Sequence, residues 1–125
     1  MRDVNGVQAV LTGARAASDA MSAAALHAQW LTYLASEKRA SRLTVRAYGD
    51  DVERYLDFLA RHRGGSPDAA MLRALGAADL RAFLASRRSE GLGARSLART
   101  LASVRAFHRF LERRAGIANA AVMSV

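Results

Sequence analysis

The stretch ARSLARTLASVRAFHRFLERR, residues 94–114 of a 125-residue chain, decides the fold class. Its apolar face recurs at i, i+4, i+7, i+11 and i+14, through Leu97, Leu101, Val104, His108 and Leu111. This spacing is that of one face of an α-helix. The opposite face combines arginine with alanine, through Arg95, Arg99, Ala102, Ala106, Arg109 and Arg113. The stretch therefore predicts a long helix that ends at Gly116, with one buried face and one cationic face.

The composition of the whole chain favours helices over strands. Alanine accounts for 28 residues and Val, Ile and Thr together for 13, and β-branched side chains lose more freedom in a helix than alanine does. Hydrophobic residues make up 51% of the chain, enough for the core of one domain. The absence of cysteine excludes disulfides, thiolate zinc sites and thiol nucleophiles. We expect an all-α fold in which four helices form an orthogonal bundle.

Three further helices are expected before residue 94. Trp30 lies on the apolar face of the first and is expected to anchor the core, while His108 in the last helix is expected to be a buried polar residue rather than a ligand. Ser41 and Thr44 are both suitable N-caps for the second helix. The predicted helices cover residues 24–39, 41–64 and 77–91, and a helical turn is allowed at 69–75.

The two ends of the chain are expected to lie outside the domain, which would cover residues 23–116. Residues 1–22 lack helical periodicity and contain Gly6 and Gly13, which is typical of a mobile tail. Residues 117–125 are expected to be a tail or the start of a linker. The chain has no apolar run long enough to span a bilayer and no secretory signal, so we expect a cytoplasmic protein without a membrane partner.

The net charge of +8 is concentrated in the last part of the chain. Residues 1–40, 41–75 and 76–125 carry net charges of +1, +1 and +6, and Lys38 is the only basic residue that is not arginine. A GC-rich genome would explain the preference for arginine over lysine, but not this clustering. A concentrated positive field indicates a polyanionic partner, of which nucleic acid is the commonest.

Several segments resemble, in the same order, the N-terminal core-binding domain of tyrosine recombinases and phage integrases, with the closest likeness to the Xer type. The first is SRLTVRAY, residues 41–48, followed by Asp51-Val52 and Phe58-Leu59. The later ones are ADLRAFL, residues 78–84, GLGARSLAR, residues 91–99, and LASVRAFHRFL, residues 101–111. The likeness covers roughly residues 24–116.

The resemblance implies a SAM-like four-helix domain that forms one jaw of a clamp around duplex DNA at a recombination half-site. The other jaw of the clamp is a C-terminal catalytic domain, absent here, and other recombinase protomers are partners in a synaptic assembly. The second and fourth helices face the DNA, which gives as candidate contacts Arg42, Thr44, Arg46, Arg95, Ser96, Arg99, Ser103 and Arg105. Their chemistry is suitable in itself, because arginine binds phosphate or guanine, and hydroxyls and amides at a helix start bind phosphate.

The chain departs from the family pattern at three turns. Gly49-Asp50 stands where the family often has two basic residues, and the glycine lowers helix propensity. Gly93 replaces the hydroxyl cap before the fourth helix, and Gly76-Ala77 replaces Thr-Pro before the third. These changes concern individual contacts rather than the fold.

The family's catalytic residues include a His-x-x-Arg pair, which the resemblance places in the C-terminal domain. Here none of the three histidines is followed by arginine at the third position. The three tyrosines, Tyr33, Tyr48 and Tyr55, lie on predicted apolar faces, where a packed aromatic ring is commoner than a nucleophile. We expect the chain to bind DNA without cutting it, and to need no metal, cofactor or small-molecule substrate.

The acidic residues of the second helix are expected to pair within that helix. The acidic residues clustered there are Asp50, Asp51, Glu53 and Asp57, and all but Glu53 lie three or four positions from Arg46, Arg54 or Arg61. Such i±3 and i±4 pairs contribute modestly to helix stability.

Two other functions fit a basic helical domain. One is a protein-interaction module, in which Phe107, Phe110 and the first helix contact a neighbouring protomer. The other is a helix-turn-helix repressor with Gly91–Gly93 as the turn, although the last helix is longer than a recognition helix needs to be.

Overall fold

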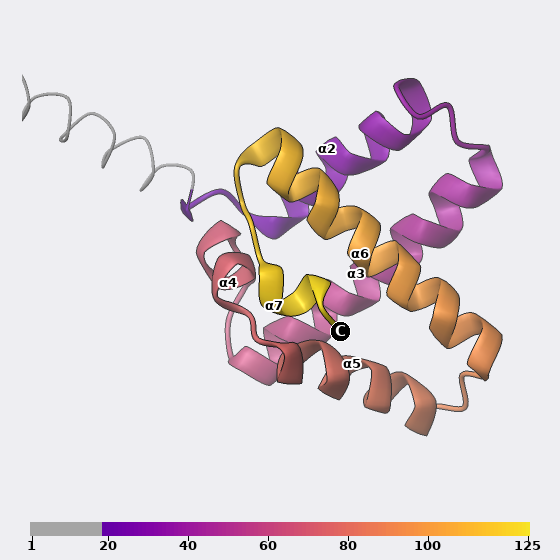
Figure 1. Ribbon diagram of the computed structural model, residues 1–125, viewed down its shortest axis with the longest axis vertical. Helices are drawn as coiled ribbons and strands as arrows, with labels where there is room; N and C mark the ends of the chain where they lie inside the picture. The colour runs from indigo at the N-terminus through magenta and orange to yellow at the C-terminus, as the bar shows by residue number, and fades with distance from the viewer. Residues whose placement is uncertain (1–18) are drawn as a thin grey trace, which may run out of the picture.

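The computed structural model describes residues 19–125, and its regular elements in that range are all helices (Figure 1). They are α2 (Ala23–Ser36), α3 (Arg42–Arg63), α4 (Ala69–Ala74), α5 (Ala77–Ser89), α6 (Ala94–Ala115) and α7 (Ala120–Met123). The predicted all-α fold is confirmed, and α2, α3, α5 and α6 are the four predicted helices. Helix α4 occupies the allowed turn at 69–75, whereas α7 was not predicted.

Local capping interactions set the ends of the longest helices. Ser41 is the N-cap of α3, and its Oγ accepts the backbone N–H of Thr44 at 3.1 Å. Gly64 ends α3 and Gly116 ends α6, with φ angles of 76° and 68° in the left-handed region that favours glycine. At the start of α5, the Asp79 carboxylate accepts the backbone N–H of Gly76 at 2.8 Å. Each of these contacts spans only a few residues, so the sequence alone could predict the helix ends.

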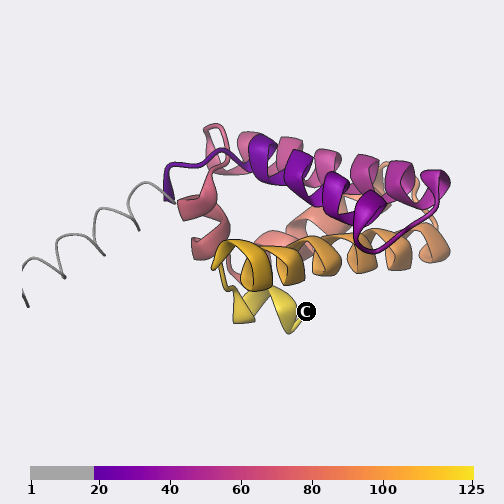
Figure 2. The same ribbon diagram turned by 90° about the horizontal axis from the view of Figure 1, so that it is seen from above.

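Helices α3 and α6 form the centre of the domain and cross each other near their middles (Figure 1). Helix α2 packs on both, and α5 packs on both from another side. Figure 2 shows α2 and α3 in one layer and α6 in the other, with α7 on the outside of α6. The core is therefore a two-layer helical packing in which α3 and α6 contact most of the other elements.

Aromatic side chains fill the space between the layers. Trp30 is fully buried, as predicted, and its ring centroid lies 5.3 Å from that of Phe107 in an edge-to-face contact. Tyr55 of α3 packs against Phe83 of α5 in a tilted contact, with ring centroids 5.3 Å apart. Phe107 and Phe110 are 0% and 8% exposed, so the expectation that they contact a neighbouring protomer is wrong. Their rings contribute to the core instead, since α6 directs them toward α2.

Gly49 lets α2 approach α3 closely. A Cβ atom at this position would lie 2.9 Å from Cδ2 of Leu31, closer than side-chain atoms normally approach. The Gly49 carbonyl oxygen lies 2.9 Å from His27 Nε2, which adds a hydrogen bond between the two helices. Glycine lowers the helix propensity of α3 at this position, but its lack of a side chain permits the close contact between α2 and α3.

A buried polar pair joins α3 to α6 in the centre of the core. The Tyr55 hydroxyl lies 2.9 Å from His108 Nε2, and His108 is 1% exposed. Burial lowers the pKa of His108 to about 4, and it raises the pKa of Tyr55 above its ordinary value. The expectation that His108 is a buried polar residue is confirmed, and its imidazole is neutral at pH 7.

Residues 117–125 are not a free tail, because they pack against the domain. Ile117 and Val122 are 1% and 0% exposed, and α7 contacts α5 and α6. Asn119 holds this segment in place, since its Nδ2 donates to the carbonyl oxygens of Leu72 and Leu75 at 2.9 and 2.8 Å. That these residues lead into a linker stays a prediction.

The folded part also begins earlier than predicted. Most of the expected N-terminal tail lies outside the described residues, but the chain just before α2 is held by hydrogen bonds. Asp19 accepts two hydrogen bonds from Arg73, at 3.1 and 2.8 Å. The Met21 carbonyl oxygen accepts the backbone N–H of Ala69 at 2.9 Å, which ties this segment to α4. Position 22 is therefore not the boundary of the fold.

Replacing Asn119 by alanine should lower the free energy of unfolding by about 2 kcal/mol, because buried carbonyl groups would lose their donor. Asn119→Asp should cost more, because a carboxylate would then face the carbonyl oxygens of Leu72 and Leu75. Denaturant unfolding checks both values, with Ala118→Ser on the exposed surface as the neutral control. Equal midpoints for Asn119→Ala and the unaltered chain would show that Asn119 does not anchor the segment.

Acid should destabilise the domain through His108 between about pH 6.5 and pH 4. The unfolded state takes up a proton there near pH 6.5, whereas the folded state resists it until about pH 4. Stability is thus highest above pH 6.5 and falls by about 3 kcal/mol across this window as the pH decreases. Unfolding at several pH values checks this: His108→Gln should flatten the dependence, and Tyr55→Phe should keep it. The same slope in His108→Gln would assign the pH dependence to other groups.

Candidate nucleic-acid interface

The solvent face of α6 carries the predicted row of arginines. Arg95, Ala102, Arg109 and Arg113 are exposed, and Ala106 is half-buried. At about 1.5 Å per residue, the row from position 95 to position 113 extends over about 27 Å. The small alanines between the arginines leave the middle of the helix open to close approach. This row, residues 95, 99, 102, 106, 109 and 113, is called the α6 face below.

Arg99 belongs to the α6 face and is bound to a carboxylate of α3. Its Nε and Nη2 donate to the two carboxylate oxygens of Asp51, at 3.0 and 2.9 Å. The Arg99 side chain remains 47% exposed, whereas Asp51 is buried. Hydrogen bonding to Asp51 raises the pKa of Arg99 above its ordinary value. The prediction that Asp51 pairs with an arginine of its own helix is wrong, because the partner lies 48 positions further along the chain.

Ser103 does not lie on the solvent-exposed surface of α6. It is 0% exposed, and its Oγ donates to Asp51 at 2.8 Å and lies 3.0 Å from the Arg99 carbonyl oxygen. The prediction of Ser103 as a DNA contact is therefore corrected: the hydroxyl faces α3 because its position on α6 lies on the side that packs against that helix.

Arg105 is also turned away from the α6 face. It is half-buried, and its guanidinium donates to the carbonyl oxygen of Val125. Its Nε is buried and makes no hydrogen bond among the described residues. Residues 117–125 pack against α6 and cover this side chain. The prediction of Arg105 as a DNA contact is therefore corrected, because its guanidinium contacts the C-terminal segment.

The start of α3 presents a second basic patch. Arg42 and Arg46 are exposed, and Leu43 between them has 80% of its surface in solvent. Thr44 is half-buried and its hydroxyl accepts a hydrogen bond from Ser41 Oγ at 3.0 Å. The starts of α3 and α6 lie at the same end of the molecule in both views (Figures 1 and 2). The first turns of α3 and α6, which carry these basic residues, therefore lie at the same end of the molecule, although the two helices diverge from the point where they cross.

The start of α6 has no side-chain cap. Gly93 is the N-cap and makes no side-chain hydrogen bond, while Ser96 in the first turn is half-buried. The first backbone N–H groups of α6 are therefore not capped by a side chain at position 93. Two of the predicted residues, Arg95 and Ser96, lie in this first turn.

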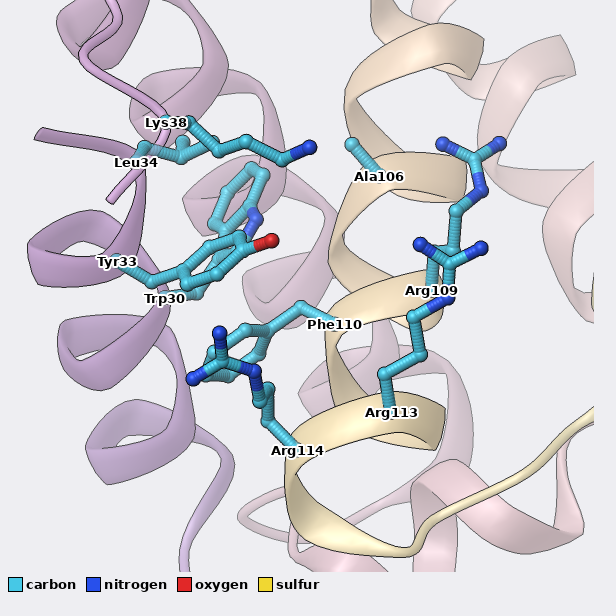
Figure 3. A pocket seen from close by; sticks show the side chains of 9 residues that line it. All are labelled: Trp30, Tyr33, Leu34, Lys38, Ala106, Arg109, Phe110, Arg113 and Arg114. Atoms are coloured by element: carbon cyan, nitrogen blue, oxygen red, sulfur yellow. The ribbon is translucent and has the colours of Figure 1, made fainter.

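A groove between α2 and the C-terminal half of α6 gathers further cations (Figure 3). Its floor consists of aromatic side chains that are largely part of the core, and its volume is about 90 Å³. Arg114 pairs with Glu37 at 2.5 Å, and its guanidinium carbon lies 4.8 Å from the centroid of the Tyr33 ring. The cationic side chains of the groove are Lys38, Arg109, Arg113 and Arg114.

No local sequence pattern marks this groove. Lys38 and Arg114 belong to helix ends, where basic residues are expected to interact with the helix dipole, so neither stood out as a binding residue. Their separation by 76 positions also gave no local signal that they share a surface. Figure 3 shows Lys38 on one side of the groove and Arg109 and Arg113 on the other.

Comparison with known families assigns the chain. The family model of the phage integrase N-terminal SAM-like domain matches residues 28–115. The chain belongs to this family. The match begins within α2 and ends with α6, so it contains part of α2 and all of α3, α5 and α6.

Named relatives of this SAM-like domain include tyrosine recombinases XerC. That of Mesorhizobium japonicum is 53% identical over 92 residues, which are 74% of this chain and 29% of the relative. That of Rhizobium meliloti is 52% identical over 93 residues, with the same shares. That of a Methylobacterium species is 55% identical over 86 residues, 69% of this chain and 27% of the relative. The chain thus spans less than a third of the length of these relatives, and no solved structure matches it.

The described part of this SAM-like domain offers neither a metal site nor a membrane span. Residues 19–125 contain no group of three or more His, Asp or Glu side chains placed to hold a metal ion. Among the same residues, none of the helices has the length and apolar character that a membrane crossing requires.

Proposed function

We propose that this domain binds duplex DNA through the α6 face and the start of α3, as the DNA-binding domain of a site-specific tyrosine recombinase. The observation that carries the proposal is the exposure of Arg95, Arg109 and Arg113 along one side of a single straight helix. A row of guanidinium groups along one helix suits a regular array of phosphates, since duplex DNA carries one negative charge per about 1.7 Å of its axis. The membership in the phage integrase family supports the same partner.

The α6 face can approach DNA closely because its middle is flat. Ala102 is exposed and Ala106 half-buried, so no long side chain stands between Arg99 and Arg109. Arg42 and Arg46 at the start of α3 would extend the contact beyond α6. Phosphate contacts of this kind fix the position of a domain on DNA, whereas sequence is read by contacts to base edges.

We infer that the domain forms one half of a clamp on a recombination half-site and does not itself cut DNA. The resemblance to the tyrosine recombinases places the catalytic residues in a C-terminal domain, and the relatives named XerC are more than three times as long as the matched segments. Tyr55 is fully buried against His108, which suits a structural role for this tyrosine. DNA binding of this kind would place the protein in the cytoplasm, with other recombinase protomers as partners.

Affinity for duplex DNA should fall steeply with salt, with a slope of about −0.9 per phosphate contact in a plot of log K against log salt. Arg95→Ala should weaken binding several-fold at low salt and reduce the slope by about one. Fluorescence anisotropy with a labelled duplex measures both. Arg81→Ala is the matched control, because it removes the same charge from an exposed position on α5. Equal losses in the two variants would assign the effect to net charge rather than to the α6 face, and no binding at low salt would exclude the proposal.

A second candidate function is a protein-interaction module, favoured by the cationic groove between α2 and α6. The partner would be an acidic segment of a neighbouring protomer, bound between Lys38 and Arg113. This candidate predicts a molar mass that rises with protein concentration, is insensitive to DNA, and reverts to the monomer in Arg113→Glu. Light scattering across a concentration series measures it. A constant monomer mass would leave DNA binding as the function of this basic surface.

A further inference from the structure

The polar cluster at the crossing of α3 and α6 surrounds one buried carboxylate. Asp51 is 3% exposed and accepts hydrogen bonds on both oxygens. Oδ2 accepts from Arg99 Nε at 3.0 Å and from Ser103 Oγ at 2.8 Å. Oδ1 accepts from Arg99 Nη2 at 2.9 Å, and the Thr100 hydroxyl lies 3.5 Å away. Every donor comes from a single stretch of α6, so the carboxylate is held against that helix from one side.

Asp51 uses only one edge of the Arg99 guanidinium. The edge formed by Nε and Nη2 faces the carboxylate in a two-point contact. Nη1 makes no hydrogen bond among the described residues, and nearly half of the side chain is exposed. The guanidinium is planar and rigid, so a fixed inner edge also fixes the direction of the outer edge formed by Nη1 and Nη2.

Among the exposed arginines of the α6 face, Arg99 is the one held by a buried partner. Arg95 and Arg109 are exposed without an ion pair among the described residues. A free arginine loses the freedom of several rotatable bonds when it binds, which weakens the contact. Arg99 loses much of that freedom on folding, because Asp51, which also accepts a hydrogen bond from Ser103, already determines the orientation of the guanidinium.

We propose that Asp51 is a positioning residue for DNA recognition, which presents the outer edge of Arg99 to a pair of acceptor atoms on the duplex. The inference rests on the proposed DNA binding and assigns to Arg99 a contact that depends on direction as well as charge. Two acceptor pairs fit the outer edge: two oxygens of one phosphate, or O6 and N7 of a guanine.

Two effects of Asp51 oppose each other. Its negative charge repels DNA, while its hydrogen bonds direct Arg99 outward. Burial keeps the carboxylate away from the surface, and Arg99, Ser103 and Thr100 donate to its oxygens. We therefore expect the directing effect to be the larger one.

A double-mutant cycle on the 125-residue chain tests the proposal with binding to labelled duplex DNA. Arg99→Ala should weaken binding about 5- to 100-fold, the range for loss of a two-point arginine contact. Asp51→Asn keeps the shape of the side chain and should weaken binding about 3- to 10-fold, because Arg99 is no longer held. The double variant should bind as Arg99→Ala does. The proposal is overturned if the Asp51→Asn variant binds DNA as tightly as the unaltered chain or more tightly. It is also overturned if the affinity loss of the double variant equals the sum of the two single losses in binding free energy.

Arg99→Lys tests the direction of the contact without altering Asp51. Lysine keeps the charge but has no planar edge, so binding should fall almost as far as in Arg99→Ala. If Arg99→Lys binds like the unaltered chain, charge alone suffices and the proposal fails. Denaturant unfolding of each variant checks that it is folded before its affinity for DNA is compared. If Asp51→Asn does not fold, the affinity of Arg99→Lys is the result that tests the proposal.

The same binding experiment distinguishes a phosphate from a guanine as the acceptor. It also distinguishes failure of the positioning role of Asp51 from failure of the proposed DNA binding. A uniform loss over all duplex sequences, with a salt slope reduced by about one, identifies a phosphate. A loss confined to duplexes with one particular G·C pair, and removed by 7-deazaguanine at that pair, identifies guanine. Both results agree with the role of Asp51. Failure of DNA binding altogether, with Arg95→Ala also without effect, would instead contradict the proposed function.

Discussion

A carboxylate buried between two helices constrains how this domain is assembled. An ionised group out of water is strongly destabilising unless it is paired and hydrogen-bonded, so Asp51 requires donors at fixed positions on α6. Arg99, Thr100 and Ser103 lie within two turns of that helix and supply them. A shift of α6 along α3 would separate these groups from the carboxylate. The cluster therefore sets the register of the two central helices, on which α2, α5 and α7 then pack.

The remaining contacts of α3 agree with this register. One turn further along, Tyr55 meets His108 of α6, and the close approach at Gly49 brings α2 against the same helix. Because interiors are close-packed, these contacts are compatible only with one arrangement of the three helices. The core thus orients α6 so that its leucines and aromatic rings point inward and the α6 face points to solvent. The same packing that stabilises the fold also exposes the arginine row to solvent.

Arg99 connects the two roles of α6. Its inner edge belongs to the fold through Asp51, and its outer edge belongs to the surface that we propose for DNA. Ser103 and Arg105 show the opposite case, since both carry suitable chemistry and yet serve internal contacts. A basic or hydroxyl side chain of α6 is therefore a candidate contact only if the structure shows it exposed to solvent.

The sequence alone determined the features that depend on neighbours within a few positions. The all-α fold, the end of α3 at Gly64 and the solvent position of Arg95 follow from helical periodicity and local capping, whereas Ser41 and Thr44 were both suitable as its N-cap. The pairing of Asp51 could not be predicted, because Arg54, three positions away, offered a local partner and the actual partner is 48 positions distant. The docking of α7 was equally hidden, since four residues carry too little periodicity and their stability comes from Asn119 and Val122 meeting other elements. Tertiary structure decided these points because only packing brings distant groups to hydrogen-bonding distance and removes the water that would otherwise satisfy them.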